Sequence, residues 1–438
     1  MMTKKGLTLG LIILLLAIFG LTGCEDTDYP DSVFDPNDPG KPTPIIAFVN
    51  PAGNSYEAVG LVEIYGTNFS ETISENVVFF NAGIGFPEPA KCDLTANPQK
   101  MAVYAPKIIK DPAQWSIDSV EVKISVQGAY LFGKYKDEDG NSVPYTLEKP
   151  AVEYGAFSDQ TLPLAVAVDK DENVYVTSAD TKVYKLLPTK HDSMIIYGSS
   201  SHTNMTDLKF APNGDLIYAR NFSTLYYFPA GGGSRKTGVK FSDRVSAIDW
   251  DANGIMYAAG MGKKIFALLA DGVTIVENDD FYEDYTVMSL KVFNNDIYTL
   301  AEYTGSDQTI PKYGIYKHAI QGNGLVSDKE LVVNWNNTGF KETIPVFMVL
   351  DENGDAFVSG DDYGVPLIHV DLSDGTAKAI YNYPTPALFT KGVHMNFGNE
   401  KILYMVRRSE RTDENAPTPR VIRISLDVKG APYYGRPQ

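Results

Sequence analysis

The sequence predicts an all-β protein with two folded domains, a β-sandwich followed by a β-propeller of six blades. Short runs of alternating apolar and polar residues fill the chain, separated by proline, glycine and aromatic residues, and no long segment of helical period follows the first 23 residues. Prolines mark two division points, at 41–44 and 147–150. Beyond the second point, a pair of short strands recurs roughly every 40 residues, which is the period of a propeller blade.

Residues 1–23 have the composition of a secretory signal. Lys4 and Lys5 precede an apolar run that extends to Leu21, and a Leu-Thr-Gly tripeptide directly precedes Cys24. This segment resembles the lipobox of bacterial lipoproteins, which implies cleavage before Cys24 and acylation of that cysteine. The alternative is an uncleaved membrane-spanning helix, but the run is short for a bilayer core.

Residues 24–43 form a predicted acidic, proline-rich tether. Glu25-Asp26-Thr27-Asp28 resembles the surface-export signal of lipoproteins from a phylum of glycan-degrading Gram-negative bacteria. The resemblance implies a lipid-anchored protein exposed on the surface of the outer membrane. The same residues also have the composition of a solvated tether, and both interpretations hold together.

The net charge indicates which classes of ligand the protein can bind, and the number of cysteines indicates whether a disulfide can form. The formal net charge is −17, which argues against nucleic acid and anionic lipid surfaces and favours neutral ligands or cations. If Cys24 is lipidated, Cys92 is the single remaining cysteine and no intrachain disulfide is expected.

Residues 44–150 are predicted to form the sandwich. Strand patterns occur at 45–49, at 61–65 and at 76–80, and residues 120–126 alternate between apolar and polar side chains. The Gly66-Thr67-Asn68-Phe69 turn and its flanking strands resemble an IPT/TIG immunoglobulin-like domain, which implies a spacer role. In this turn, we expect Gly66 to adopt a positive φ, Asn68 to cap the turn and Phe69 to plug the end of the sandwich.

Residues 151–438 carry the repeat. Leu164 to Asp169 leads through a tight turn into Asn173 to Thr177, and a third and usually a fourth strand follow. The other five copies begin near Met205, Val245, Val287, Val346 and Gly392. The pattern resembles an NHL-type propeller, to which the stretch 152–157 adds a closing strand, and a tandem of smaller sandwiches is the alternative fold.

The loops of the propeller are predicted to differ between its two faces. The tight turns between first and second strands lie on one face, and the longer loops lie on the opposite face. Aromatic rings can pack against the C–H faces of sugars, and polar groups can hydrogen-bond to their hydroxyls, although some of these rings could instead be plugs that hold the loops down. The candidate ligand-binding residues of the long loops are Tyr282, Tyr285, Tyr303, Tyr313, Trp335, Tyr363, Tyr383, Asp361, Asp362, Arg407 and Arg408.

The sequence favours a binding protein over an enzyme, and no catalytic residue, metal or cofactor is predicted. The adjacent acids at 279–280 and 361–362 are more typical of solvated charge clusters than of a general acid/base pair. The five histidines lack metal-ligand spacing, and two of them, His318 and His369, are predicted to be structural residues of third strands. The acidic stretches at 169–173 and 351–355 resemble calcium loops but lack the terminal glutamate, which favours hairpin turns.

The predicted domain order resembles that of surface glycan-binding lipoproteins of polysaccharide-utilisation systems. This resemblance implies non-covalent binding of an oligo- or polysaccharide on the long-loop face in support of uptake, with an outer-membrane transporter as a further partner. Two alternatives stay open. A propeller polysaccharide lyase or glycosidase requires a base or a carboxylate pair in the axial pocket, and a protein-interaction module requires a broad apolar patch.

Overall fold

The computed structural model describes residues 39–83, 88–90, 95–109, 114–361, 365, 367–381, 391–408 and 419–436. Regular structure within these residues consists of β-strands and two single-turn 3-10 helices, Ile73–Glu75 (η1) and Trp335–Asn337 (η2), which confirms the all-β prediction. No helix in this part of the chain is long and apolar enough to span a bilayer. The predicted lipidation site Cys24, like Cys92, lies outside the described residues.

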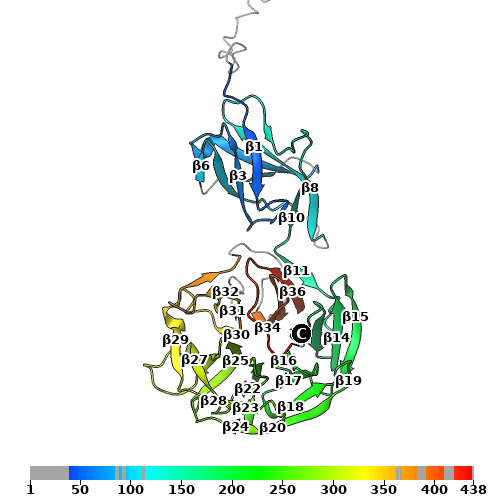
Figure 1. Ribbon diagram of the computed structural model, residues 1–438, viewed down its shortest axis with the longest axis vertical. Helices are drawn as coiled ribbons and strands as arrows, with labels where there is room; N and C mark the ends of the chain where they lie inside the picture. Colours follow the sequence, from blue (N-terminus) through cyan, green and yellow to red (C-terminus); the bar gives the residue numbers. More distant parts are fainter. Residues whose placement is uncertain are drawn as a thin grey trace, which may run out of the picture. The chain divides into compact units, whose positions relative to one another are not determined.

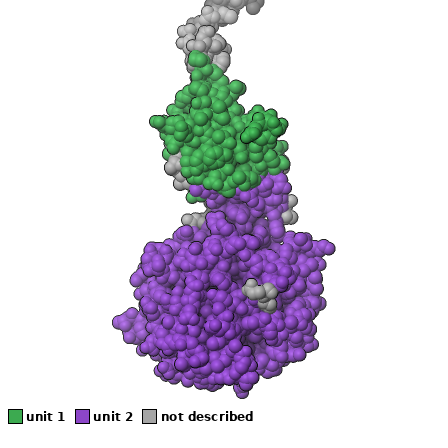
Figure 2. Space-filling view, in the orientation of Figure 1, with its two compact units in different colours: residues 1–53, 62–104, 119–145 green, residues 54–61, 105–118, 146–438 purple. Residues whose placement is uncertain are grey.

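The chain divides into two compact units (Figure 2). The first comprises residues 1–53, 62–104 and 119–145, and the second comprises residues 54–61, 105–118 and 146–438. Three segments from within the predicted sandwich therefore group with the propeller unit.

Two sheets form the sandwich. One has the order β1 (Ile45–Asn50), β3 (Leu61–Thr67), β7 (Lys100–Tyr104) and β6 (Thr95–Asn97). The other has the order β2 (Asn54–Tyr56), β10 (Tyr145–Glu148), β8 (Ser116–Val126), β4 (Asn76–Asn81) and β5 (Glu88–Ala90), and β9 (Gly133–Lys134) also pairs with β8. Alternate residues of β8 from Val120 to Val126 are buried, as period-two strands with one face on a core require.

The Gly66 turn differs in one detail from the prediction. The positive φ, 64°, belongs to Asn68, not to Gly66. Gly66 is needed for a different reason, since a β-carbon there would lie 1.8 Å from the carbonyl oxygen of Ile45 on the paired strand. Phe69 is buried as expected, and the IPT/TIG assignment stays a prediction.

Six four-stranded units form the propeller, which confirms the predicted number of blades (Figure 1). Blade 1 contains β12 (Pro163–Val168), β13 (Val174–Ser178), β14 (Lys182–Leu187) and β15 (Lys190–Ser199), with the short β19 (Gly233–Ser234) paired to β15. Blade 2 contains β16 (Asp207–Phe210), β17 (Leu216–Ala219), β18 (Phe222–Phe228) and β20 (Lys236–Val245). Blade 3 contains β21 (Ala247–Trp250), β22 (Met256–Ala259), β23 (Phe266–Leu268) and β24 (Ile275–Glu277).

The remaining three blades follow the same order. Blade 4 contains β25 (Tyr285–Phe293), β26 (Asp296–Tyr303), β27 (Tyr313–Gly322) and β29 (Glu330–Asn334), with β28 (Leu325–Val326) also paired to β27. Blade 5 contains β30 (Pro345–Leu350), β31 (Ala356–Gly360), β32 (Leu367–Val370) and β33 (Ala377–Ala379). Blade 6 contains β34 (Lys391–Phe397), β35 (Ile402–Arg408), β36 (Arg420–Ser425) and, from the other end of the propeller sequence, β11 (Ala151–Tyr154).

The ring closes at both its inner and its outer rim. The innermost strands contact one another in succession, and β34 of blade 6 contacts β12 of blade 1. At the outer rim, β11 pairs antiparallel with β36, with Ala151 opposite Ile424 and Tyr154 opposite Val421. The predicted closing strand at 152–157 is therefore present as β11.

Candidate functional site

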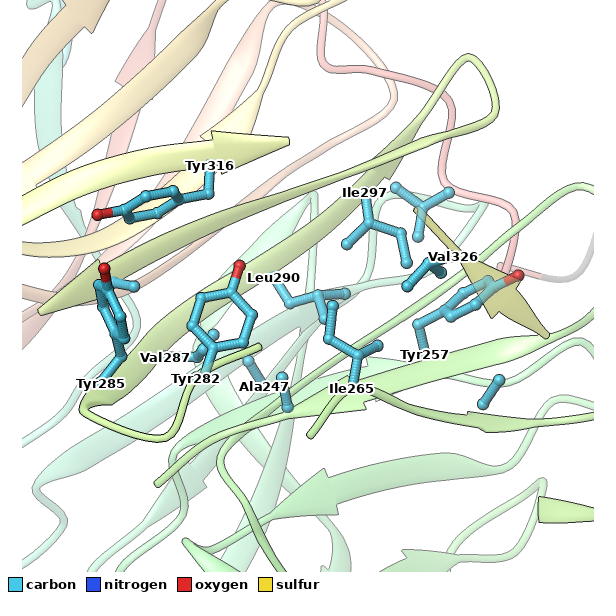
Figure 3. Close-up of a cluster of buried hydrophobic side chains, with 14 of the residues drawn as sticks. Ala247, Tyr257, Ile265, Tyr282, Tyr285, Val287, Leu290, Ile297, Tyr316 and Val326 are labelled. Carbon is cyan, nitrogen blue, oxygen red and sulfur yellow. The ribbon is translucent and has the colours of Figure 1, made fainter. Parts of the chain in front are cut away.

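Three of the predicted ligand-binding tyrosines are core residues. Tyr282 and Tyr285 lie in the apolar cluster between blades 3 and 4 (Figure 3). Tyr303 belongs to the same cluster. The hydroxyl of Tyr282 lies 2.5 Å from the Thr299 Oγ1 and 2.8 Å from the His318 Nε2, so its polar end is hydrogen-bonded inside the cluster. Burial of these rings leaves no open face for a sugar, and the expectation that they form an exposed platform is wrong for this reason.

Trp335 and Arg407 are also buried. The Trp335 side chain is fully buried, and its Nε1 donates to the carbonyl of Thr343 at 2.9 Å. Arg407 donates to the Glu153 carboxylate at 2.6 Å. Neither residue belongs to an exposed binding face, which corrects the prediction for both.

The other predicted ligand-binding residues have different outcomes. Tyr313 and Asp361 are half-buried, and Arg408 is exposed, so a ligand role for these three stays a prediction. Asp361 already accepts a hydrogen bond from the Ile344 amide at 2.8 Å. Asp362, Tyr363 and Tyr383 lie outside the described residues.

The innermost strands instead bring charged side chains together around the propeller axis. One oxygen of Asp207 on β16 lies 2.9 Å from the Nε2 of His394 on β34, and the other accepts the Ile248 amide at 3.0 Å. The Nδ1 of His394 accepts the Val166 amide at 3.2 Å, which places the imidazole proton on Nε2. This histidine is therefore neutral, in keeping with the lowering of its pKa by burial.

Asp207 stays ionised in this buried setting. Burial alone would raise the pKa of its carboxyl, but the ammonium of Lys291, the hydrogen bond from His394 and the ammonium of Lys209 together hold that pKa below its usual range. The network therefore depends on a negative charge at its centre that is neutralised from neighbouring blades.

Two lysines and a second aspartate continue the network. The ammonium of Lys209 lies 3.4 Å from the Asp249 Oδ1, and the other oxygen of Asp249 accepts the Val292 amide at 2.9 Å. Lys291 is buried and donates to the carbonyl of Leu290 at 3.0 Å. Burial, followed by repulsion from Lys209, lowers the pKa of Lys291 to about 8.

A cavity of about 280 Å³ opens beside this network, on the face that carries the tight turns. Residues 430–433 and Arg436 line it from the C-terminal segment, where Ala431 donates to the Leu350 carbonyl at 3.0 Å and the Tyr433 hydroxyl donates to the Phe210 carbonyl at 2.7 Å. The polar and aromatic side chains that line the cavity are those of Lys170, Lys209, Asp249, Lys291, Asn396, Phe397, Asn399, Tyr433 and Arg436. We call it the axial pocket.

Hydrogen-bond donors dominate the axial pocket. The Nδ2 of Asn396 and the Nε of Arg436 are buried and have no hydrogen-bond partner among the described residues, while the Nη2 of Arg436 donates to the Phe397 carbonyl at 3.0 Å. Four cationic side chains line the pocket, and Asp249 is the one carboxylate that lines it among the described residues. The pocket is therefore locally basic although the whole chain is acidic.

The sequence contains a pattern that indicates the axial charges. In Asp207-Leu208-Lys209 and again in Ile248-Asp249-Trp250 and Leu290-Lys291-Val292, a charged residue interrupts a short apolar strand. Alternation places such charges on one side of the strand, and in a first strand that side can face the axis.

Comparisons with known proteins yield matches among solved structures alone. No protein-family model and no curated protein matches the chain. An auxiliary nutrient binding protein from Bacteroides ovatus is 14% identical over 90% of this chain and 99% of its own, with a TM-score of 0.46. A gluconolactonase from Xanthomonas campestris is 12% identical over 61% of this chain and 86% of its own, with a TM-score of 0.45. A virginiamycin B lyase from Staphylococcus aureus is 10% identical over 70% of this chain and 91% of its own, with a TM-score of 0.42.

The lowered pKa of Lys291 predicts an unusual dependence of stability on pH. Between pH 8 and pH 10 the folded protein binds fewer protons at this site than the unfolded chain does, because the ordinary pKa is 10.5. The free energy of unfolding should therefore rise with pH in this window, by at most about 1.4 kcal/mol per pH unit. Urea unfolding at pH 8, 9 and 10 should show this contribution in the unchanged protein and not in the Lys291→Met variant. Equal slopes for the two proteins would contradict it.

Proposed function

We propose that the protein is a cell-surface lipoprotein that binds a nutrient glycan non-covalently and holds an acidic sugar residue in the axial pocket. The observation that carries this proposal is the convergence of buried, unpartnered donors on Asn396 and Arg436 with the ammonium groups of Lys209 and Lys291. Buried donors without a partner are costly, and a carboxylate supplies the acceptors that they lack.

The size of the pocket supports a single sugar residue. Its volume of about 280 Å³ lies just below the range of pockets for drug-sized ligands, about 300–1,000 Å³. The rings of Phe397 and Tyr433 line it and can pack against the C–H face of a sugar, while the Nδ2 of Asn396 can donate to a hydroxyl. A longer glycan would therefore enter by one terminal residue.

The charge of the pocket decides between neutral and acidic sugars. The whole chain is acidic and by itself favours neutral ligands, but salt screens interactions beyond about 8–10 Å. The four cations that line the pocket outnumber the one carboxylate of the lining, Asp249, and the carboxylate of Asp207 lies behind them in the same network. We therefore prefer an acidic sugar over the neutral glycan favoured by the net charge.

The anchor and the export route belong to the same proposal. Acylation at Cys24 and the acidic tether would hold the protein on the outer membrane. Confinement to that surface raises the effective concentration of binding sites, which compensates for weak affinity at each site. Transfer of the captured glycan to an outer-membrane transporter would complete its role in uptake.

A second candidate function, a lyase acting on acidic polysaccharides, is favoured by the lowered pKa of Lys291. A neutral lysine amine can take the proton from the carbon next to a sugar carboxylate. The electron pair then forms a carbon–carbon double bond, the bond to the leaving sugar oxygen breaks, and that oxygen takes a proton from solvent. Release of unsaturated product from an acidic polysaccharide would establish this function in place of capture.

Calorimetric titration with glucuronate, galacturonate, glucose and galactose tests the binding proposal. We expect an acidic sugar to bind and Lys291→Met to weaken its binding by at least about 30-fold, since loss of one partner of a buried charge pair costs about 2–5 kcal/mol. Lys378→Met, at an exposed lysine of β33, is the matched control and should bind as the unchanged protein does. Equal affinity for glucuronate and glucose, or retention of full affinity in Lys291→Met, would contradict the proposal.

A further inference from the structure

A second polar cluster lies in blade 5, at the turn between β30 and β31. Asp351 and Asp355 belong to this turn, and His369 lies on the third strand, β32. The Nε2 of His369 is 3.5 Å from the Asp351 Oδ2 and 3.8 Å from the Asp355 Oδ2. One donor atom from each of the three residues lies within 4.8 Å of the other two.

Asp351 contributes a buried oxygen that has no hydrogen-bond donor. Its side chain is 1% exposed, and its Oδ1 accepts the amides of Asn353 and Asp355 at 2.9 and 3.0 Å. Within the part of the chain that the structure describes, its Oδ2 has no hydrogen-bond partner, and it lies 3.5 Å from the Nε2 of His369. An ionised oxygen in this position needs a counter-charge or a ligand.

Blade 1 shows how the same turn is completed without a ligand. Asp169 takes the place of Asp351, and its Oδ1 likewise accepts two turn amides. Its Oδ2 accepts from the Asn173 Nδ2 at 2.8 Å and from the Tyr175 hydroxyl at 3.0 Å. Both lone-pair directions of this oxygen are therefore used by donors from the blade itself.

Blade 5 lacks both of these donors. At the positions of Asn173 and Tyr175 it carries Asp355 and Phe357, so that a carboxylate replaces an amide and a phenyl ring replaces a phenol. The residue opposite Tyr175 on the next strand is Lys185, whereas the residue opposite Phe357 is His369. The aspartate and the phenylalanine each remove a hydrogen-bond donor, and the histidine removes a fixed positive charge. The aspartate and the histidine also add a side chain that can bind a metal ion.

From this substitution pattern we propose that Asp351, Asp355 and His369 bind one divalent transition-metal ion, with zinc as the best match. One imidazole and two carboxylates form the mixed nitrogen and oxygen set that zinc accepts, and an imidazole ligand argues against calcium. Tetrahedral zinc ligands lie about 3.4 Å apart, which the two distances to His369 already approach. The side chains of Asp355 and His369 are 25% and 17% exposed, which leaves room for Asp355 to rotate and for water to complete the coordination.

The bound ion would join the turn of blade 5 to its third strand. The same turn also contacts the C-terminal segment, because the Glu352 amide donates to the Lys429 carbonyl at 2.9 Å. Metal binding should therefore raise the thermal stability of the propeller, and none of the three proposed ligands is among the residues that line the axial pocket.

The test uses the full chain without a histidine tag, freed of metal by a chelator and then dialysed. We expect one equivalent of Zn²⁺ to bind by calorimetry and to raise the melting temperature, and Co²⁺ to give a visible absorption band on binding. The double variant Asp355→Asn with Phe357→Tyr restores the blade 1 residues, so we expect it to fold and to lose at least tenfold in Zn²⁺ affinity. His369→Gln provides a second, single-site variant with the same expected loss.

His191→Gln is the matched control, because the Nδ1 of His191 likewise lies beside a single aspartate, 3.0 Å from the Asp192 Oδ1, and its ring stacks on Trp115. It should bind Zn²⁺ as the unchanged protein does. The proposal is overturned if the unchanged protein binds no Zn²⁺, if the blade 1 variant and His369→Gln bind it undiminished, or if His191→Gln alone abolishes binding.

Discussion

Replacing Asp207 by alanine is expected to destabilise the propeller by about 3–5 kcal/mol, the usual cost of removing one partner from a buried charge pair. The carboxylate of Asp207 is fully buried and accepts from His394 and from the Ile248 amide. Without it, the ammonium of Lys291 would lose its strongest compensating charge, and the Ile248 amide would lose its acceptor. The substitution would weaken contacts in blades 2, 3, 4 and 6 together, because the first strands of these blades meet at the axis.

Chemical unfolding at pH 7 measures this loss. Asp192→Ala is the matched control, since the side chain of Asp192 is 79% exposed and a surface change of this kind is expected to alter stability by less than about 0.5 kcal/mol. The stability loss of Asp207→Asn should lie between those of Asp207→Ala and Asp192→Ala, because asparagine keeps the shape of the side chain but removes its charge. A loss below about 1 kcal/mol for Asp207→Ala would show that the axial charges are not coupled as described.

The fold was predictable because its signal is local and repeated. Asp169, Asp251 and Asp351 each directly follow a first strand, and each accepts two turn amides on one carboxylate oxygen. A hydrogen-bonding pattern confined to five residues is visible in the sequence without knowledge of distant contacts. The recurrence of this turn along the chain, each time between two short strands, therefore predicts the blades.

The aromatic residues of the long loops were misjudged because their surroundings are not local. Tyr282 and Tyr285 follow the last strand of blade 3, yet their rings pack against Tyr316 from the third strand of blade 4 (Figure 3). A connecting loop whose rings pack against the next blade buries those rings, and neither loop length nor composition reveals that contact.

The blade 5 cluster was missed for a related reason. Asp351 and Asp355 are four residues apart, but His369 joins them from another strand through the pairing of β31 with β32. Spacing along the chain therefore gives no ligand motif. Comparison between blades does give one, since the repeat makes Asn173 and Asp355 equivalent positions with opposite hydrogen-bonding character.

Replacing Trp335 by alanine is expected to cost about 3–5 kcal/mol of stability, the usual range for a fully buried tryptophan, and to leave the affinity of the folded protein for a sugar unchanged. The indole packs in the core cluster of blades 4 and 5 with Val333, Met348 and Ile368, and η2 holds it there. Its Nε1 also donates a hydrogen bond to the Thr343 carbonyl. Trp335→Ala therefore leaves a cavity and also leaves this carbonyl without its donor.

Trp335→Phe separates these two contributions, because it keeps most of the ring volume and removes the donor. It should lose about 1–2 kcal/mol, less than the alanine variant loses. Calorimetric unfolding measures stability, and titration with an acidic sugar measures binding per folded molecule. If a Trp335 variant kept full stability but lost sugar binding, Trp335 would belong to an exposed binding loop, as its position in the sequence predicts. Loss of stability alone would show that its role is to fill the core between blades 4 and 5.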